Sequence, residues 1–266
     1  MNAYQSSESA LSYQNFLSSK NGQVFQNIIL NVVLQRLKPE DKPNILDAGC
    51  GQGWLSFELN KLGFKISACD ASENLITEAR EIYPEIDFQV ADLTQNLPYP
   101  PESFDAIILN MVAHDLEDQM AAFKNLYSML KNRGKLIAAI VNPYYGYPVG
   151  VWKRGVLGFL LRKKPMLKLA ESYNLLKTKA NKTFSWQPHL RSRFYPLSEH
   201  LNNFINAGFN LTHFQDLDFN KDPEEFNLEY QLYRFPIILL LEFEKSPVPS
   251  SPGEGRMPEG QERSNR

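Results

Sequence analysis

The segment Ile45–Trp54 constrains the fold more than any other part of the sequence. It reads Ile-Leu-Asp-Ala-Gly-Cys-Gly-Gln-Gly-Trp, so an apolar run leads into three glycines at alternate positions. Glycine permits a tight turn and lets the backbone approach a ligand that a Cβ would block. In open α/β sheets, ligands bind at the carboxyl ends of the strands. We therefore expect a nucleotide-type ligand at a turn between a strand and a helix.

The spacing of these glycines indicates which of the known types of nucleotide-binding turn is present. A dinucleotide fingerprint, G-x-G-x-x-G, needs a glycine at position 54, where Trp54 stands. A Walker A loop needs Gly-Lys-Ser/Thr at its end, and the turn has no such ending. What remains is D-x-G-x-G-x-G, in which Asp47 precedes the first glycine by two positions. This spacing disfavours a nicotinamide-dependent oxidoreductase.

Strand-like and helix-like segments alternate around the turn. The expected strands are 44–48, 65–70, 86–91, 104–110 and 134–142, with helices at 22–37, 53–62, 72–83 and 115–130. After a break at 144 the pattern resumes with a helix at 198–207 and strands at 209–214 and 230–243. Such alternation predicts a mostly parallel sheet covered by helices on both faces.

Two further acids stand where predicted strands end. Asp70 closes the second strand, where its carboxylate can accept hydrogen bonds from both hydroxyls of a ribose. Asp92 closes the third strand, where a carboxylate can accept from an exocyclic adenine amine. Each acid alone could instead cap the following helix. Three acids at successive strand ends beside one glycine turn favour a shared site for a nucleoside.

Several segments resemble class I S-adenosylmethionine-dependent methyltransferases, close to the small-molecule group that includes quinone and sterol methyltransferases. They are 45–53, 68–72, 91–93 with Leu97 and Pro98, 103–108 and 130–140. The resemblance implies an α/β fold, a Rossmann-like, doubly wound seven-stranded sheet with an antiparallel last strand, and S-adenosylmethionine as cofactor. It implies that the glycine turn holds the methionine end, the second-strand acid the ribose and the third-strand acid the adenine. The cofactor-binding residues implied are Asp47, Gly49, Gly51, Gly53, Asp70, Ala71, Asp92, Leu93 and Asn110.

The segment Asn110–Asp115 lies at the end of the fourth predicted strand and is expected to face the reacting methyl group. Methyl transfer from a sulfonium is an in-line displacement, so positioning and water exclusion can do much of the work. A base is needed only when the acceptor loses a proton. His114 is a candidate catalytic base because histidine titrates near neutral pH, and Asn110 is a second candidate. Alternatively, His114 only satisfies backbone groups at the start of the next helix.

Residues 144–195 differ from the rest in charge, with eleven Lys/Arg and a single acid, Glu171. Apolar and basic residues interleave from Trp152 to Lys168, which predicts a basic amphipathic helix and an inserted helical lid. Three interpretations remain open: a lid over the substrate pocket, peripheral membrane contact through 149–168 that reaches a lipid-soluble acceptor, or an electrostatic site for an anionic acceptor. A nucleic-acid partner is disfavoured because no appended RNA-binding module is visible.

The predicted organisation has five parts. They are an N-terminal arm and helix (1–38), a cofactor-binding core (39–143), the basic helical lid (144–195), the end of the core (196–245) and a disordered tail (246–266). The N-terminus has no signal-peptide pattern and the longest apolar run is too short to span a bilayer. Cys50 and Cys69 have no metal-ligand spacing, so we expect no metal and a cytoplasmic protein, with possible association at a membrane surface.

Together these observations predict a methyltransferase that transfers the methyl group of S-adenosylmethionine to the oxygen or carbon of a small or lipid-like acceptor. Two alternatives stay open. One is a binding or assembly protein that keeps the cofactor fold without turnover, and the other is an RNA methyltransferase.

Overall fold

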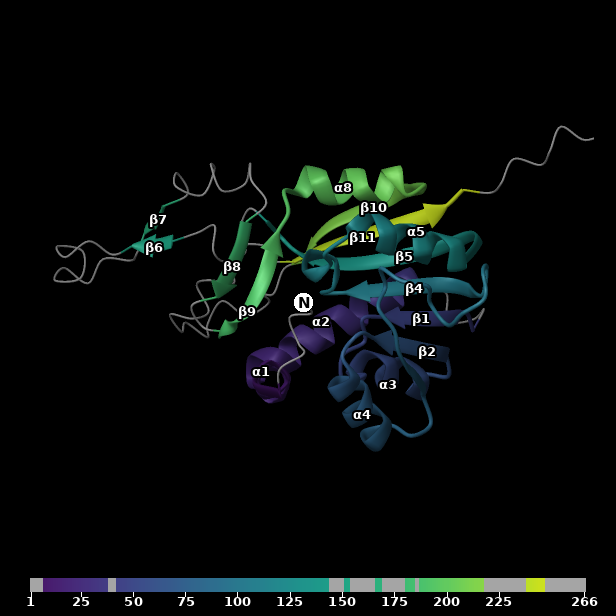
Figure 1. Ribbon diagram of the computed structural model, residues 1–266, viewed down its shortest axis with the longest axis horizontal. Helices are drawn as coiled ribbons and strands as arrows, with labels where there is room; N and C mark the ends of the chain where they lie inside the picture. Colours follow the sequence, from purple (N-terminus) through teal and green to yellow (C-terminus); the bar gives the residue numbers. More distant parts are fainter. Residues whose placement is uncertain are drawn as a thin grey trace, which may run out of the picture.

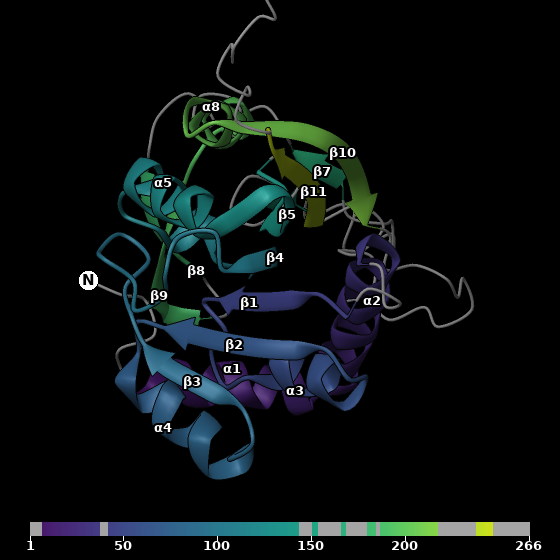
Figure 2. The ribbon, with the colours of Figure 1, turned by 90° about the vertical axis from the view of Figure 1, so that its right-hand side faces the viewer.

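The computed structural model describes residues 7–37, 42–143, 151–153, 166–168, 180–184, 187–217 and 238–246. A seven-stranded sheet in the order β10-β11-β5-β4-β1-β2-β3 lies at the centre (Figures 1 and 2). Its strands are β1 (Asn44–Ala48), β2 (Lys65–Asp70), β3 (Asp87–Val90), β4 (Phe104–Asn110), β5 (Leu130–Val141), β10 (Phe209–Leu217) and β11 (Ile238–Lys245). The helices are α1 (Ser7–Ser18), α2 (Lys20–Arg36), α3 (Trp54–Lys61), α4 (Glu73–Ile82), α5 (Gln119–Met129), α8 (Leu197–Asn206) and the short 3₁₀ helix η2 (Ala113–Asp115).

The strand directions confirm the predicted sheet. β1 pairs in parallel with β2 and β4, and the parallel pairing continues to β3 on one side and β5 on the other. β11 pairs antiparallel with both β5 and β10. The last strand is therefore antiparallel and lies inside the sheet, and all the parallel strands end at one edge.

Alternation of side chains along the strands builds one hydrophobic core on each face of the sheet. In β1, Ile45 packs with α2 and α3, while its neighbour Leu46 packs with α5 and α8. β4 repeats the pattern, since Ile108 belongs to the first core and Ile107 to the second. Figure 2 shows α2 and α3 on one side of the sheet and α5 and α8 on the other.

The helix expected at 115–130 begins later than the sequence suggests. Residues 113–115 form η2, and α5 starts at Gln119 because the Asp118 side chain caps it by accepting from Ala121 N at 2.9 Å. The segment 111–118 is thereby left as a connection at the carboxyl end of β4. It forms one wall of the site described below.

The described residues of the insertion are strands, so the expectation of a helical lid is wrong for them. β6 (Val151–Lys153) pairs antiparallel with β7 (Met166–Lys168), and β8 (Ala180–Phe184) pairs antiparallel with β9 (Gln187–Phe194). Backbone pairing across the connection requires an extended chain, a requirement that local periodicity does not reveal. Most of the predicted amphipathic helix, 154–165, lies outside the described residues, as does the tail from 247 onward. Within the described part of the chain, no helix is long and apolar enough to cross a membrane.

Candidate functional site

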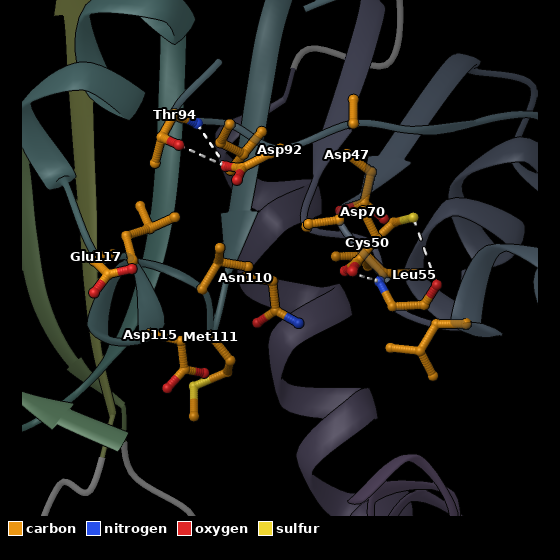
Figure 3. A pocket seen from close by; sticks show the side chains of 18 of the residues that line it. Asp47, Cys50, Leu55, Asp70, Asp92, Thr94, Asn110, Met111, Asp115 and Glu117 are labelled. Atoms are coloured by element: carbon orange, nitrogen blue, oxygen red, sulfur yellow. Dashed lines mark hydrogen bonds between the residues drawn. The ribbon is translucent and has the colours of Figure 1, made fainter. Parts of the chain in front are cut away.

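A cavity of about 190 Å³ opens at the carboxyl ends of β1, β2 and β4 (Figure 3). This is the edge where parallel α/β sheets bind their ligands. The residues that line it come from the glycine turn, the ends of the strands and the segment after β4. They are Asp47, Gly49, Cys50, Gly51, Trp54, Leu55, Asp70, Ala71, Leu75, Ala91, Asp92, Leu93, Thr94, Asn110, Met111, Val112, Asp115, Leu116 and Glu117.

The glycine turn is tied to the end of β2. The backbone nitrogens of Gly49 and Cys50 both donate to the carbonyl of Cys69, at 2.7 and 3.0 Å. Gly49, Gly51 and Gly53 all have positive φ, at 78°, 56° and 81°. A side chain in this region of φ is strained, so the turn needs glycine at each of the three positions.

Asp47 is buried at the end of β1, where only 2% of its surface is exposed. Its Oδ2 accepts a 2.6 Å hydrogen bond from the Ser56 hydroxyl of α3. The pKa of Asp47 is raised to about 6, mainly by burial, which the Ser56 hydrogen bond opposes and the nearby Asp70 carboxylate reinforces. A carboxylate held in this way favours a cationic group beside it, because such a group restores the interaction lost with water.

Asp70 ends β2 and connects the glycine turn to α4. Its Oδ2 accepts from Gly51 N at 3.0 Å and its Oδ1 accepts from Ser72 N at 2.8 Å. Ser72, and not Asp70, is the N-cap of α4. Burial raises the pKa of Asp70 even though these backbone hydrogen bonds lower it. A carboxylate has about four acceptor positions, so Asp70 can still accept from a ligand.

Asp92 lies after β3 at the exposed rim of the cavity. Its Oδ1 accepts from the backbone nitrogen of Thr94 at 2.9 Å and from the Thr94 hydroxyl at 2.8 Å. These bonds hold the carboxylate in a local turn and do not use its other oxygen. Leu93 is buried beside it and also lines the cavity.

Asn110 ends β4, and its side chain lies between the Asp70 and Asp115 sides of the cavity (Figure 3). Its Oδ1 is buried and has no hydrogen-bond partner among the described residues. A buried acceptor of this kind costs free energy until a donor reaches it. The next residue, Met111, has a φ of 61°, a strained backbone conformation for a residue with a side chain. The end of β4 thus combines a strained backbone at Met111 with a hydrogen-bond acceptor, Asn110 Oδ1, that has no partner among the described residues.

The structure places two predicted site residues outside the cavity wall. Gly53 is the N-cap of α3 and faces Phe88, because a Cβ at position 53 would lie 2.5 Å from Phe88 Cζ. His114 belongs to η2 and does not line the cavity. Its Nε2 lies 3.6 Å from Asp115 Oδ2, and its buried Nδ1 has no partner among the described residues. The eight other predicted residues all line the cavity.

Two acids of the wall, Asp115 and Glu117, were not singled out from the sequence. They belong to the stretch His-Asp-Leu-Glu-Asp, so the signal was a group of acids in the connection that follows a strand. With Asp47, Asp70 and Asp92, they are the charged residues of the lining, and none of the described residues that line the cavity is Lys, Arg or His. The wall therefore favours a ligand with positive charge.

The fit to S-adenosylmethionine rests on this donor and acceptor set. The cofactor carries a sulfonium and an ammonium, and the cavity offers acids and an unpaired amide oxygen at Asn110. Its ribose and adenine carry hydroxyl and amine donors, and Asp70 and Asp92 have unused acceptor positions. Among the described residues no cluster of His, Cys, Asp and Glu could hold a metal ion.

Comparisons with known proteins found one family whose description matches part of this chain, and several proteins with similar sequences. Residues 46–138 match the family described as methyltransferase domain. The ubiquinone biosynthesis O-methyltransferase of Xanthomonas axonopodis pv. citri is 31% identical over 117 residues, which are 42% of this chain and 48% of the relative. The demethylmenaquinone methyltransferase of Paenarthrobacter aurescens is 26% identical over 144 residues, 54% of this chain and 55% of the relative. The chain thus spans about half the length of each of these relatives.

Solved structures show the same fold. An S-adenosylmethionine-dependent methyltransferase from Mesorhizobium loti superposes with a TM-score of 0.65 at 22% identity, over 81% of this chain and 96% of that one. One from Methanosarcina mazei gives a TM-score of 0.55 at 16% identity, over 82% and 98%. The sheet order, the family match and these structures agree with the resemblance seen in the sequence. Residues 46–138 therefore match a methyltransferase domain, and the chain has the fold of S-adenosylmethionine-dependent methyltransferases.

Proposed function

We propose that this protein is an enzyme that transfers the methyl group of S-adenosylmethionine to oxygen or carbon of a small or lipid-like acceptor. The observation that carries the proposal is the cavity wall. It joins the glycine turn, acids from the ends of three neighbouring strands and the unpaired amide oxygen of Asn110 at one edge of the sheet. The names of the two relatives, a ubiquinone biosynthesis O-methyltransferase and a demethylmenaquinone methyltransferase, support a quinone-like acceptor.

Different residues of the cavity would bind different parts of the cofactor. Asp47 would hold the cationic amino group near the glycine turn, with Gly49 and Gly51 allowing close approach of the backbone. Asp70 with Ala71 would hold the ribose, and Asp92 with Leu93 would contact the adenine. When bound, the sulfonium supplies an electrophilic methyl group.

In catalysis, the protein would mainly position the cofactor and the acceptor relative to each other. Asn110 Oδ1 would accept a hydrogen bond from the cofactor or the acceptor at the exit of β4. Trp54, Leu55 and Met111 would keep water from the reacting atoms, because their apolar side chains line the same cavity. His114 remains a candidate base only if its ring turns toward the cavity, since it is not part of the wall.

The insertion 144–195 would cover the acceptor. β9 contacts both η2 and α1, so its backbone lies near the end of the sheet where the cavity opens (Figure 1). Contact of 149–168 with a membrane surface, and location in the cytoplasm, stay predictions from the sequence. Most of the segment that would make the membrane contact lies outside the described residues.

A methyl-transfer assay tests the proposal. The protein is incubated with S-adenosylmethionine labelled in the methyl group and with a panel of prenylated quinols, sterols, fatty acids and cell extract, and label in each class is measured. We expect label in a small-molecule or lipid fraction. Label in RNA would favour the RNA methyltransferase alternative, and cofactor binding without transfer to any class would favour the non-catalytic alternative.

Two carboxylate variants provide matched controls for this assay. Asp70→Ala should weaken binding of S-adenosylhomocysteine by about 30-fold or more, because it removes charge-assisted hydrogen bonds to the ligand. Asp105→Ala should leave the affinity unchanged. Asp105 also accepts from a backbone nitrogen, that of Asn44 at 2.9 Å, but it lies at the other end of β4 and does not line the cavity. Unchanged affinity in Asp70→Ala would mean that the assignment of the ribose carboxylate is wrong.

A further inference from the structure

The connection formed by residues 113–117, which supplies one wall of the cavity through Asp115, Leu116 and Glu117, belongs neither to the sheet nor to α5. It consists of η2 and the two residues that follow, before the N-cap of α5 at Asp118. Asp115, Leu116 and Glu117 of this segment line the cavity. Because no strand pairing fixes these residues, their position depends on the partners that their backbone groups find elsewhere.

A buried side chain holds the start of this wall. Gln119, at the first position of α5, is 2% exposed, and its Nε2 donates to the carbonyl of Ala113 at 2.7 Å. Its Oε1 accepts from Asn203 Nδ2 of α8 at 2.9 Å, and its Nε2 lies 3.0 Å from His200 Nδ1. The start of the wall is therefore connected to the core between α5 and α8.

A second buried side chain holds the end of the wall. The hydroxyl of Tyr195 donates to the carbonyl of Leu116 at 2.9 Å and lies 3.3 Å from the carbonyl of Glu117. Tyr195 is 4% exposed, and its ring centroid lies 5.3 Å from that of His200. The ring is therefore fixed by packing, and its hydroxyl reaches the backbone of two residues that line the cavity.

Tyr195 also stands at a particular point of the chain, directly after β9. The backbone of β9 contacts η2 on one side and α1 on the other. The hydrogen bond from Tyr195 thus joins the last strand of the insertion to the wall of the cavity. If β9 moved, residues 115–117 would be displaced through the hydrogen bond from the Tyr195 hydroxyl and through the backbone contact between β9 and η2.

We propose that Tyr195 is a positioning residue of the cofactor site. Its hydroxyl fixes the carbonyls of Leu116 and Glu117, and this bond holds the side chains of 115–117 against the ligand. The inference rests on the proposed function, because it concerns the same cavity. It adds a link between the insertion, which would cover the acceptor, and the wall that would face the cofactor.

The test is Tyr195→Phe, which removes the hydroxyl and keeps the ring. We expect the affinity for S-adenosylhomocysteine, measured by calorimetry, to fall about five- to tenfold, because one hydrogen bond that orders the wall is lost. In the transfer assay KM for S-adenosylmethionine should rise by a similar factor, while kcat at saturating cofactor changes less. Hydrogen exchange at 114–118 should become faster in the variant.

Tyr99→Phe is the matched control. The Tyr99 hydroxyl also donates to a backbone carbonyl, that of Ala68 at 3.2 Å, but Ala68 lies within β2, which pairs with a strand on each side. This variant should lose a similar hydrogen bond and keep its affinity for S-adenosylhomocysteine. The comparison separates loss of a buried hydroxyl from loss of this particular contact.

The outcomes distinguish the inference from the proposed function. If the unaltered protein binds S-adenosylhomocysteine and Tyr195→Phe binds equally well, the inference is wrong and the proposed function stands. The same conclusion follows if both tyrosine variants lose affinity alike. If the unaltered protein does not bind, the proposed function is wrong and the inference is overturned with it.

Discussion

At the scale of the residue, the three glycines of the turn after β1 are needed for different structural reasons. Gly49 and Gly51 line the cavity, and Gly51 N donates to Asp70. A Cβ at position 49 would lie 2.4 Å from Val112 Cγ2, so this glycine lets the turn pack against the segment after β4. Gly53 makes room for Phe88 under α3. One motif therefore combines ligand approach with packing between helix and strand.

Gly49→Ala is expected to disturb the site through both strain and collision. The positive φ alone costs about 1–2 kcal/mol for a residue with a side chain, and the contact with Val112 adds to this. Chemical denaturation should show a clear loss of unfolding free energy, and calorimetry a loss of affinity for S-adenosylhomocysteine. Gly63→Ala is the control, because φ is 86° there and a Cβ would meet nothing within 4 Å.

Gly63→Ala should therefore show the strain alone and bind normally. Adding Val112→Ala to Gly49→Ala should recover part of the lost stability, because it removes the atoms that collide with the new Cβ. Equal losses of stability and normal affinity in Gly49→Ala and Gly63→Ala would contradict the packing argument.

The pKa of Asp47 predicts how cofactor affinity depends on pH. Burial raises this pKa to about 6 from an ordinary value of 3.8. Below pH 6 the free protein mostly holds the neutral acid, whereas a cationic amino group prefers the carboxylate. The affinity for S-adenosylhomocysteine should therefore rise about tenfold from pH 5 to pH 7, the change in the ionised fraction across that range. Burial also raises the pKa of Asp70, which acts in the same direction.

Asp47→Asn is the control for this pH profile. Asparagine can still accept from Ser56, so the variant should fold, bind more weakly and show a flatter profile between pH 5 and pH 7. If the variant and the unaltered protein gave parallel profiles, the pH dependence would arise from another group.

At the scale of the element, α8 is attached to the sheet by stacked aromatic rings. The Phe204 ring lies 3.8 Å from Phe123 of α5 and 4.3 Å from Phe243 of β11, measured between ring centroids. Phe204 is completely buried. This stack fixes α8, and with it Asn203 and His200, which contact Gln119 behind the wall of the cavity.

Phe204→Ala should destabilise the fold by about 3–5 kcal/mol, the usual cost of removing a buried phenylalanine. Its neighbour Ile205 is 52% exposed, so Ile205→Ala should change stability by no more than about 0.5 kcal/mol. Denaturant unfolding of both variants checks the prediction. A similar small effect for both would mean that α8 is not held by this stack.

The sequence predicted the cofactor half of the sheet well. The bounds of β1, β2 and β4 agree with the predicted strands to the residue, because each is a buried apolar run that ends at glycine, acid or amide. The register of the parallel pairs then brings Asp47, Asp70 and Asn110 to one edge without any further information. Local signals are sufficient where every strand ends at the same edge.

The wall after β4 could not be predicted in the same way. Asp115 and Asp118 are both able to cap a helix, and only the tertiary structure decides in favour of Asp118. That choice leaves His114 and Asp115 on a 3₁₀ turn, where consecutive side chains point in different directions. Asp115 lines the cavity and His114 does not. The strands of the insertion could not be predicted from the spacing of its apolar residues, because this spacing does not show the antiparallel pairing of β6 with β7 and of β8 with β9.

At the scale of the whole molecule, charge separates the cofactor cavity from the insertion. Residues 144–195 carry a net charge of about +10, and the rest of the chain about −12. The cavity lies in the acidic part, and the charged side chains among the described residues of its wall are acids. A cationic cofactor and a lipid-like or anionic acceptor would thus meet two parts of the molecule with opposite charge.

The most direct test of the account is calorimetric titration of the protein with S-adenosylhomocysteine, beside NADH. We expect micromolar binding of the first ligand, with one site per chain, and no binding of NADH. That result would establish the cofactor and justify the search for the acceptor. Binding of neither ligand would contradict the assignment of the cavity, and binding of NADH alone would mean that the glycine turn serves a dinucleotide after all.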